Sequence, residues 1–266
     1  MDYVLSTDNL VKSYGQARAL SGLSMHVPKG AIYGIVGRNG AGKTTLIRLI
    51  CGLQRPTSGT YSIYGREFTS RDIRLSRRRM GAVVETPSIY LDMSARENLR
   101  QQYRVLGLPS FEGIDELLAL VGLADTGKKR ARNFSLGMKQ RLGIAQAVLN
   151  DPSVLVLDEP TAGLDPKERV RFRNLISSLA QDKIVILSTH IVSDVEYIAD
   201  EILVMRAGGI ITTGTVDEIT GDIRGCVWEC TVAPREADAM SASLTVGNIH
   251  YAQDGSAIVR VVAQQR

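Results

Sequence analysis

Eight consecutive residues of this chain have types and spacing that could do chemistry. They read Gly37-Arg38-Asn39-Gly40-Ala41-Gly42-Lys43-Thr44, which is the pattern G-x-x-x-x-G-K-T of a phosphate-binding loop. Glycines let the backbone curl until its N–H groups point at phosphate oxygens. Lys43 is expected to reach the β- and γ-phosphates, and the Thr44 hydroxyl to ligate Mg²⁺. The alternative is a glycine-rich turn in front of an ordinary helix.

The segments on both sides favour the phosphate-binding interpretation. Residues 31–36 are apolar enough for a short buried strand, and residues 45–50 have the pattern of a helix that follows the loop. A helix that begins at this point adds partial positive charge where phosphate would bind. Thr45, at the start of the helix, is therefore counted with the loop among the nucleotide-binding residues.

A second motif predicts what happens to the nucleotide. The aliphatic run Val154–Leu157 indicates a strand buried on both faces of a parallel sheet, and it ends in Asp158 and Glu159. Ligands bind at the carboxyl ends of such strands. Asp158 is placed to hold Mg²⁺ through water, and Glu159 to polarise the attacking water as general base. Without a phosphate loop beside it, a solvated acidic strand end would be the simpler interpretation.

Further motifs accompany these two in a regular order. They are Asn133–Arg141 (NFSLGMKQR), Ala162–Pro166 (AGLDP) and Ser188-Thr189-His190, the last at the end of the apolar run 183–187. With them, residues 3 to 220 resemble the ATP-binding subunit of an ABC transporter. The segments VVETPSIY and FSLGMKQRLGIA are most similar to those of the subgroup that handles lantibiotics and bacitracin-type peptide antibiotics.

The resemblance assigns roles to residues outside the loop. It implies that Tyr14 stacks on adenine, and that Ser135 and Gly137 bind the γ-phosphate of a second ATP across a head-to-tail dimer. His190 would hydrogen-bond the γ-phosphate and hold the water, and Asp165 would belong to the dimer loop. The alternatives are that Tyr14 only packs on the sheet at a strand end, that Ser135 and Gly137 only begin a capped helix, and that His190 is a structural histidine. The chain reads F-S-L-G-M where the family commonly has L-S-G-G-Q, so the phosphate-facing serine and second glycine are retained.

Glu85 departs from the family pattern, which usually has glutamine at this position. The resemblance places the residue between the catalytic sheet and the helical arm, in contact with Mg²⁺ and water. A carboxylate can ligate Mg²⁺ through hard oxygen, although it adds negative charge near the γ-phosphate. The alternative is that Glu85 only begins a loop before Pro87.

Composition restricts the protein class further. The net charge of +4 is too small to imply nucleic acid, and three cysteines without disulfide-like spacing fit a reducing compartment. Cys226 and Cys230 have no nearby histidine, which argues against a metal site. No signal peptide and no membrane-spanning apolar run is visible. A separate permease would supply the spans, with this chain cytoplasmic and peripheral on the inner face of the membrane.

Two basic runs stand apart from these motifs. One comprises Arg71, Arg74, Arg77, Arg78 and Arg79, and the other Lys128, Lys129, Arg130 and Arg132. Both are expected to be solvated faces, with contact to an anionic membrane leaflet as the alternative.

The pattern of strands and helices predicts an α/β fold, a P-loop ATPase with a central, mostly parallel sheet. Strands 3–14, 20–28 and 60–64 suggest an antiparallel side sheet, and residues 94 to 150 a helical signature arm, with a capping box at Ser94 and a second helix at 115–121. Alternation then resumes with strand 153–158, helix 166–180, strand 184–189, helix 191–198 and strand 201–205. Residues 1–221 form the nucleotide-binding domain, and residues 222–266 a small C-terminal α+β appendage with strands 228–232 and 257–262 around helix 235–242.

The sequence thus predicts an ATPase, working as a homodimer or with a paired ATPase subunit, that binds ATP and Mg²⁺ and drives a separate permease. Two alternatives are a mechanical or signalling ATPase that engages a membrane partner without moving a solute, and an ATPase acting on ribosomes or DNA. Proteins of the second kind typically carry two cassettes in one chain or long coiled-coil insertions. This chain has neither, so no nucleic-acid partner is expected.

Overall fold

The computed structural model describes residues 3–30, 32–221, 224–252 and 254–263. It divides into two compact units, residues 1–215 and 216–266. The strands of the first unit are β1 (Tyr3–Tyr14), β2 (Ala17–Pro28), β3 (Ile32–Gly37), β4 (Ser58–Ile63), β5 (Arg66–Glu67), β6 (Met80–Val83), β7 (Val154–Asp158), β8 (Ile184–Thr189), β9 (Glu201–Arg206) and β10 (Gly209–Gly214). Its α-helices are α1 (Lys43–Ile50), α2 (Ile73–Arg77), α3 (Ala95–Leu106), α4 (Ile114–Leu120), α5 (Leu136–Val148) and α6 (Pro166–Leu179), and its 3₁₀ turns are η1 (Ala124–Thr126), η2 (Ala131–Asn133) and η3 (Val192–Asp194).

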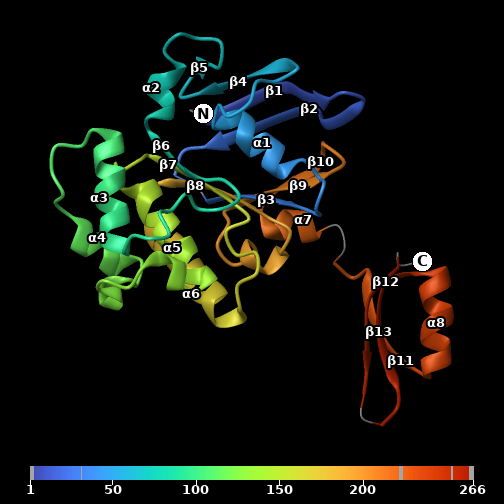
Figure 1. The fold of residues 1–266 in the computed structure, drawn as a ribbon. Helices are drawn as coiled ribbons and strands as arrows, with labels where there is room; N and C mark the ends of the chain where they lie inside the picture. Colours follow the sequence, from blue (N-terminus) through green and yellow to red (C-terminus); the bar gives the residue numbers. More distant parts are fainter. Residues whose placement is uncertain (1–2, 31, 222–223, 253, 264–266) are drawn as a thin grey trace. The chain divides into compact units, whose positions relative to one another are not determined.

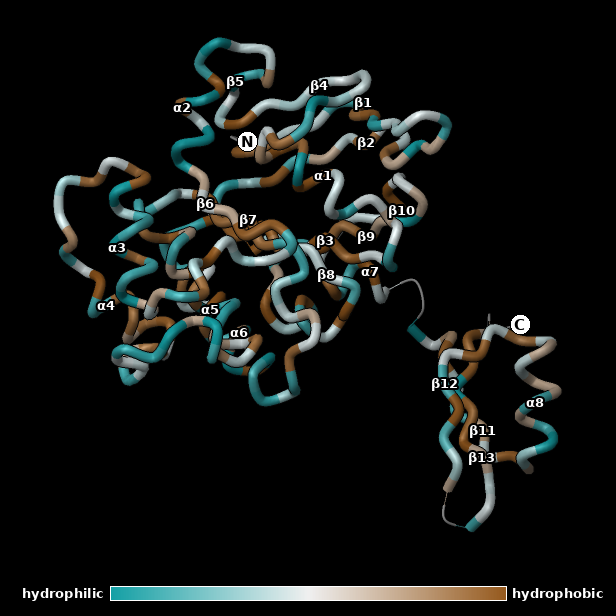
Figure 2. The backbone as a smooth tube through the Cα atoms, in the orientation of Figure 1, coloured by the Kyte–Doolittle hydropathy of each residue, from teal (hydrophilic) through white to brown (hydrophobic). Residues whose placement is uncertain are grey.

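The central sheet has the strand order β10-β9-β3-β8-β7-β6. Neighbouring strands from β9 to β6 pair in parallel, and β10 is an antiparallel edge strand. Every residue of β3, β7 and β8 is buried, as expected for strands covered on both faces. Their hydrophobic course is visible in Figure 2. The carboxyl ends of β3, β8, β7 and β6 therefore meet at one edge.

A second, antiparallel sheet has the order β2-β1-β4-β5. Helix α1 contacts β2 of this sheet and β3, β7 and β8 of the central sheet (Figure 1). Leu46, Ile47, Leu49 and Ile50 of α1 are fully buried in the shared core. The helix that follows the phosphate loop is thus held between two sheets, which fixes the position of its N-terminus.

The helical arm consists of α3, α4 and α5 (Figure 1). Helix α3 begins with a complete capping box, because the Ser94 hydroxyl accepts the Glu97 amide and the Glu97 carboxylate accepts the Ser94 amide. Helix α5 contacts β6. A Cβ at Gly143 of α5 would lie 2.6 Å from the Pro87 side chain, so this glycine lets the segment after β6 lie against the arm.

The second unit contains α7 (Val216–Gly221), β11 (Val227–Val232), α8 (Pro234–Ser243), β12 (Thr245–Tyr251) and β13 (Ala257–Val262). Its antiparallel sheet has the order β11-β13-β12, and α8 packs against β12 and β13. The small core comprises Ala237, Ala257, Val259 and Val261. The unit is therefore an α+β element with a core of its own.

The predicted fold class is confirmed, including the antiparallel side sheet, the arm and the α+β appendage. The start of the strand predicted for residues 31–36 falls on Ala31, which lies outside the described residues. The structure divides its two units at residue 215, and the boundary at residue 221 remains a prediction. Strands β5, β10 and β12 and helices α2 and α7 were not predicted.

The helix predicted for residues 191–198 is wrong. The chain forms only the short 3₁₀ turn η3 there, followed by further turns. The physical reason is tertiary packing: Asp194 is buried and accepts a hydrogen bond from the Thr161 hydroxyl, and Val195 is buried against Gly34 of β3. The apolar spacing that suggested a helix comes from this irregular packing.

Candidate active site

The phosphate loop joins β3 to α1 and depends on glycine at its turns. Gly40 has a φ of 82° and Gly42 a φ of 103°, in the left-handed region that favours glycine. A Cβ at Gly42 would also lie 2.6 Å from the Ala19 carbonyl oxygen. Helix α1 begins at Lys43, so its first N–H groups face the loop. The sequence motif thus has the local geometry that phosphate binding requires.

Other loop residues divide between exposed and buried positions. Arg38 and Asn39 are exposed, and Ala41 is buried with its amide bonded to the Arg38 carbonyl at 3.0 Å. Thr44 and Thr45, in the first turn of α1, are half-buried. Their roles in binding nucleotide remain predictions.

Lys43 is 5% exposed and points back across its own loop. Its ammonium donates to the Gly37 carbonyl at 2.7 Å and lies 2.9 Å from a carboxylate oxygen of Glu159. A buried ammonium needs such partners, because leaving it unpaired would cost several kcal/mol. The loop lysine and the predicted general base are therefore in direct contact in this structure.

Glu159 connects two strands of the site. Its second carboxylate oxygen lies 2.7 Å from Nδ1 of His190, which follows β8. The residue has a φ of 48°, which is strained for a side chain larger than glycine. Ser188 holds the strained backbone in place, since the Glu159 amide donates to its carbonyl at 3.0 Å and to its hydroxyl at 3.1 Å. One carboxylate thus joins Lys43 and His190.

Asp158, at the end of β7, is 1% exposed. One carboxylate oxygen accepts the Ser188 hydroxyl, and the other is buried without a hydrogen-bond partner among the described residues. Such an orphan acceptor is costly unless a cation or water meets it. The described residues contain no cluster of three or more His, Cys, Asp or Glu side chains suited to a metal. Asp158 and the Thr44 hydroxyl offer hard oxygens of the kind that Mg²⁺ prefers, and their role as its ligands remains a prediction.

Glu85 lies two residues beyond β6 and is 54% exposed. Its carboxylate forms an ion pair with Arg48 of α1, and its backbone has a φ of 62°. In this structure its partner is therefore an arginine of the phosphate-loop helix. Its predicted contact with Mg²⁺ remains a prediction.

The other predicted residues are held in separate contacts. Ser135 is exposed and caps α5 by accepting the Met138 amide at 3.2 Å, and Gly137 is buried. A Cβ at Gly137 would meet the Glu168 carboxylate at 2.4 Å, so close packing against α6 also requires this glycine. Asp165 caps α6 by accepting the Glu168 amide at 2.8 Å. Ser135 and Gly137 lie at the N-terminus of α5 and Asp165 at that of α6, and phosphate can bind at a helix N-terminus.

Tyr14, at the end of β1, is 45% exposed, and its hydroxyl donates to the Gln54 side chain. The Lys12 ammonium lies 5.1 Å from the centre of the ring, and stacking on adenine remains a prediction.

Sequence reasoning missed three residues that orient the site. Ser188 binds both Asp158 and the Glu159 backbone, Arg48 pairs with Glu85, and Gln54 accepts from Tyr14. The position of Ser188 at the end of a buried strand was a usable signal. Arg48 and Gln54 had none, because their partners are 37 and 40 residues away in the chain.

Known proteins with similar sequence and structure identify the family. Residues 20–162 match the family model described as ABC transporter. The bacitracin transport ATP-binding protein BcrA of Bacillus licheniformis is 43% identical over 213 residues, covering 79% of this chain and 69% of that protein. The lantibiotic transport ATP-binding protein SrtF of Streptococcus pyogenes is 42% identical, covering 78% of this chain and 89% of that protein.

A solved structure agrees with the sequence matches. The protein cbiO1 of Clostridium perfringens, described as part of the ABC transporter complex cbiONQ, superposes with a TM-score of 0.74 at 28% identity, covering 85% of this chain and 94% of that one. This chain belongs to the ABC transporter family. It is an ATP-binding subunit that hydrolyses ATP to power transport. A search of the described helices for one long and apolar enough to cross a bilayer finds none.

Replacing Glu159 with glutamine tests the general base. Turnover should fall about 100-fold or more, because proton abstraction from water is lost. ATP binding should persist and tighten, since the carboxylate that occupies Lys43 becomes neutral. Phosphate release and binding of a fluorescent ATP analogue measure the two effects. Glu196→Gln, which removes the same charge from an exposed residue, serves as the control, and wild-type turnover in Glu159→Gln would exclude the assignment.

Replacing Lys43 with alanine tests the phosphate contact. ATP affinity should fall by about 10-fold or more, since a charge-assisted hydrogen bond to phosphate is lost. Isothermal titration with ATP measures the affinity, and thermal unfolding shows whether the variant remains folded. Lys128→Ala, at an exposed position, is the control. An unchanged dissociation constant in a folded Lys43→Ala variant would mean that Lys43 is not a ligand.

Proposed function

We propose that this subunit works as a head-to-tail dimer and drives a separate membrane permease that exports a peptide antibiotic, giving self-immunity or resistance. The observation that carries the proposal is the similarity to BcrA and SrtF, which are named for bacitracin and lantibiotic transport. In the proposed complex the subunit is peripheral on the inner face of the cell membrane.

The hydrolytic step is assigned to the shared carboxylate. Lys43 binds the β- and γ-phosphates, which requires its contact with Glu159 to open, and Glu159 then accepts a proton from the attacking water. His190 keeps its hydrogen bond to Glu159 and orients the carboxylate. Thr44 and Asp158 would hold Mg²⁺, which neutralises charge on the phosphates when bound. The orphan oxygen of Asp158 supports this ligand set.

The dimer proposal rests on the exposed start of α5. Ser135 is exposed at the N-terminus of a 13-residue helix, where the helix dipole and free N–H groups favour an anion. Phosphate from an ATP bound to a second copy is an anion that could reach this end. Asp165 caps the start of α6, and Glu168 in the first turn of that helix packs against Gly137 of α5.

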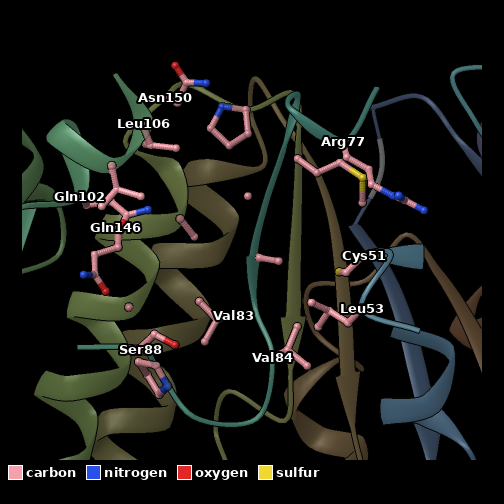
Figure 3. Close-up of a pocket in the computed structure, with 18 of the residues that line it drawn as sticks. Cys51, Leu53, Arg77, Val83, Val84, Ser88, Gln102, Leu106, Gln146 and Asn150 are labelled. Carbon is pink, nitrogen blue, oxygen red and sulfur yellow. The ribbon is translucent and has the colours of Figure 1, made fainter. Parts of the chain in front are cut away.

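A groove beside the edge strand β6 is the proposed docking place for the permease. It has a volume of about 830 Å³ and is lined by the arm on one side and by residues near α1 on the other (Figure 3). Gln102, Leu106 and Gln146 come from the arm, and Cys51 and Leu53 face them. Burial raises the pKa of the Cys51 thiol to about 12, so it remains neutral.

Three features of the groove support a protein ligand. Leu53 and Val105 are 64% and 66% exposed, so an apolar surface is available to cover. Gln146 lines the groove, is only 8% exposed, and its side-chain nitrogen has no hydrogen-bond partner in the described part of the chain. Arg77 and Arg78 add positive charge at one end. We assign the groove to a short amphipathic segment of the permease.

Glu85 connects this groove to the phosphate loop. Thr86 and Pro87 line the groove, and the next residue toward β6 is Glu85, whose carboxylate pairs with Arg48 on α1. Movement of a docked partner would therefore act on the helix that begins with Lys43. Coupling between transport and hydrolysis is assigned to this connection.

The cargo is tested in cells that express the chain together with the membrane protein proposed as its permease. Expression of the wild type should raise the concentrations of bacitracin or a lantibiotic that inhibit growth by several-fold, and Glu159→Gln should remove the protection. Equal protein levels on blots control for expression. Co-purification of the membrane protein without any change in susceptibility would contradict the cargo and favour a mechanical or signalling role.

Replacing Glu85 with glutamine tests the coupling. Basal ATP binding should persist, because the carboxylate has no contact with Lys43, while permease-stimulated turnover or its Mg²⁺ optimum should change as the ion pair with Arg48 is lost. Phosphate release across a Mg²⁺ titration, with and without permease, measures this. Glu112→Gln, which removes a carboxylate from the arm, is the matched control. Superimposable curves for wild type and Glu85→Gln would mean that Glu85 is only a loop residue.

A further inference from the structure

The structure separates the arginines of the first basic run by their contacts. Arg77 donates to the Tyr61 hydroxyl, and the Arg79 guanidinium lies 4.0 Å from the centre of the Tyr64 ring and 3.3 Å from the Ser153 hydroxyl. These two arginines are therefore engaged inside the unit.

Arg66, Arg71 and Arg74 differ from them. All three are exposed, and their guanidinium groups have no hydrogen bond, ion pair or ring contact within the described residues. Arg66 lies on β5 and Arg74 on α2, two elements that contact each other (Figure 1). Leu75, 49% exposed, lies beside them. We call Arg66, Arg71, Arg74 and Leu75 the arginine patch.

The segment that contains the arginine patch has an excess of positive charge. Residues 66–79 contain six arginines and two acids, Glu67 and Asp72, an excess of four. The whole chain has a net charge of +4, so the remainder is balanced. A local excess of this size creates a field that attracts anions over about 10 Å at moderate ionic strength.

In the second basic run, Lys128 to Arg132, two of the four cations form an ion pair or a ring contact with a described residue. The Arg132 guanidinium lies 3.2 Å from the Asp92 carboxylate, and the Lys129 ammonium lies 5.9 Å from the centre of the Phe134 ring. Arg130 acts electrostatically on Glu97, whose pKa is lowered mainly by hydrogen bonds from Ser94. Each run therefore contains cations with and without partners, and Arg66, Arg71 and Arg74 differ in lying together on and between β5 and α2, without a partner among the described residues.

We propose that the arginine patch binds the phosphate groups of an anionic phospholipid surface, with Leu75 entering the headgroup layer. Guanidinium groups match phosphate oxygens in geometry and charge, and a basic surface with an exposed apolar side chain is typical of peripheral membrane contacts. Arg78, the C-cap of α2, lines the groove assigned to the permease, so the patch adjoins that groove. The inference rests on the proposed membrane location, and the lipid contact itself needs no permease.

Vesicle binding of the full chain tests the proposal without the permease. The probes are vesicles of phosphatidylglycerol mixed with phosphatidylcholine and vesicles of phosphatidylcholine alone, each at low and at physiological salt. The wild type should sediment with the anionic vesicles, more strongly at low salt, and not with the neutral ones. Arg66→Gln/Arg71→Gln/Arg74→Gln should weaken binding by more than about 10-fold, since each basic residue near the surface contributes about fivefold. Leu75→Ser should weaken it further at physiological salt.

The matched control is Lys128→Gln/Lys129→Gln/Arg130→Gln, which lowers the net charge by the same amount. It should bind anionic vesicles within about twofold of the wild type, because these cations follow the arm helix α4 and not the β5–α2 surface that meets the vesicle in the proposal. An equal loss in both triple variants would overturn the patch in favour of net charge. Absence of wild-type binding to anionic vesicles at low salt would overturn the lipid assignment, and patch-dependent binding to purified permease instead would make an acidic protein segment the partner.

Basal ATP hydrolysis separates this inference from the proposed function. The patch lies outside the phosphate loop and its acids, so both triple variants should hydrolyse ATP at the wild-type rate, which also shows that they are folded. Export by a wild-type chain that does not bind anionic vesicles would contradict only the lipid contact. Binding to anionic vesicles by a wild-type chain that gives no export would contradict only the transport assignment.

Discussion

The site depends on one carboxylate that two other residues share. Glu159 contacts the buried ammonium of Lys43 with one oxygen and the His190 ring with the other. Lys43 cannot remain buried and charged without an anion nearby. That anion is Glu159 in this structure, and in the proposed mechanism it is phosphate when ATP binds. The Glu159 carboxylate and the ATP phosphate would then be alternative partners of the same ammonium.

The parallel register of the central sheet makes this sharing possible. Val36 is paired with Thr189, and Asp158 with Ser188, so the ends of β3, β8 and β7 lie side by side. Residues that leave these three strands must converge at one edge. The helix α1, held between two sheets, sets the direction from which Lys43 approaches. A shift of one residue in any of these pairings would point the side chains to the opposite face.

Both unusual acids of the site have left-handed backbones. Glu159 and Glu85 have φ values of 48° and 62°, each costing on the order of 1 kcal/mol. Such strain persists only where the surroundings determine it, and at Glu159 two hydrogen bonds from its amide to Ser188 do so. At Glu85 the side chain is paired with Arg48. In the proposed coupling, these two acids after β7 and β6 connect hydrolysis to the groove that the arm borders.

The sequence by itself determined the local parts of this protein. The loop at 37–44, the buried strands, the capping box at Ser94 and the strand-end acids were readable because each depends on neighbours within a few residues. Strand β12 was missed, since a register shift between Val246 and Asn248 breaks its alternation, and helix 191–198 was wrong because Asp194 and Val195 pack on distant elements. Only the tertiary structure decided which partners meet across the chain: Lys43 with Glu159, Glu85 with Arg48, and Arg77 with Tyr61, while Arg71 and Arg74 have no partner among the described residues. Those choices depend on register and packing between segments far apart in sequence, and no local pattern encodes them.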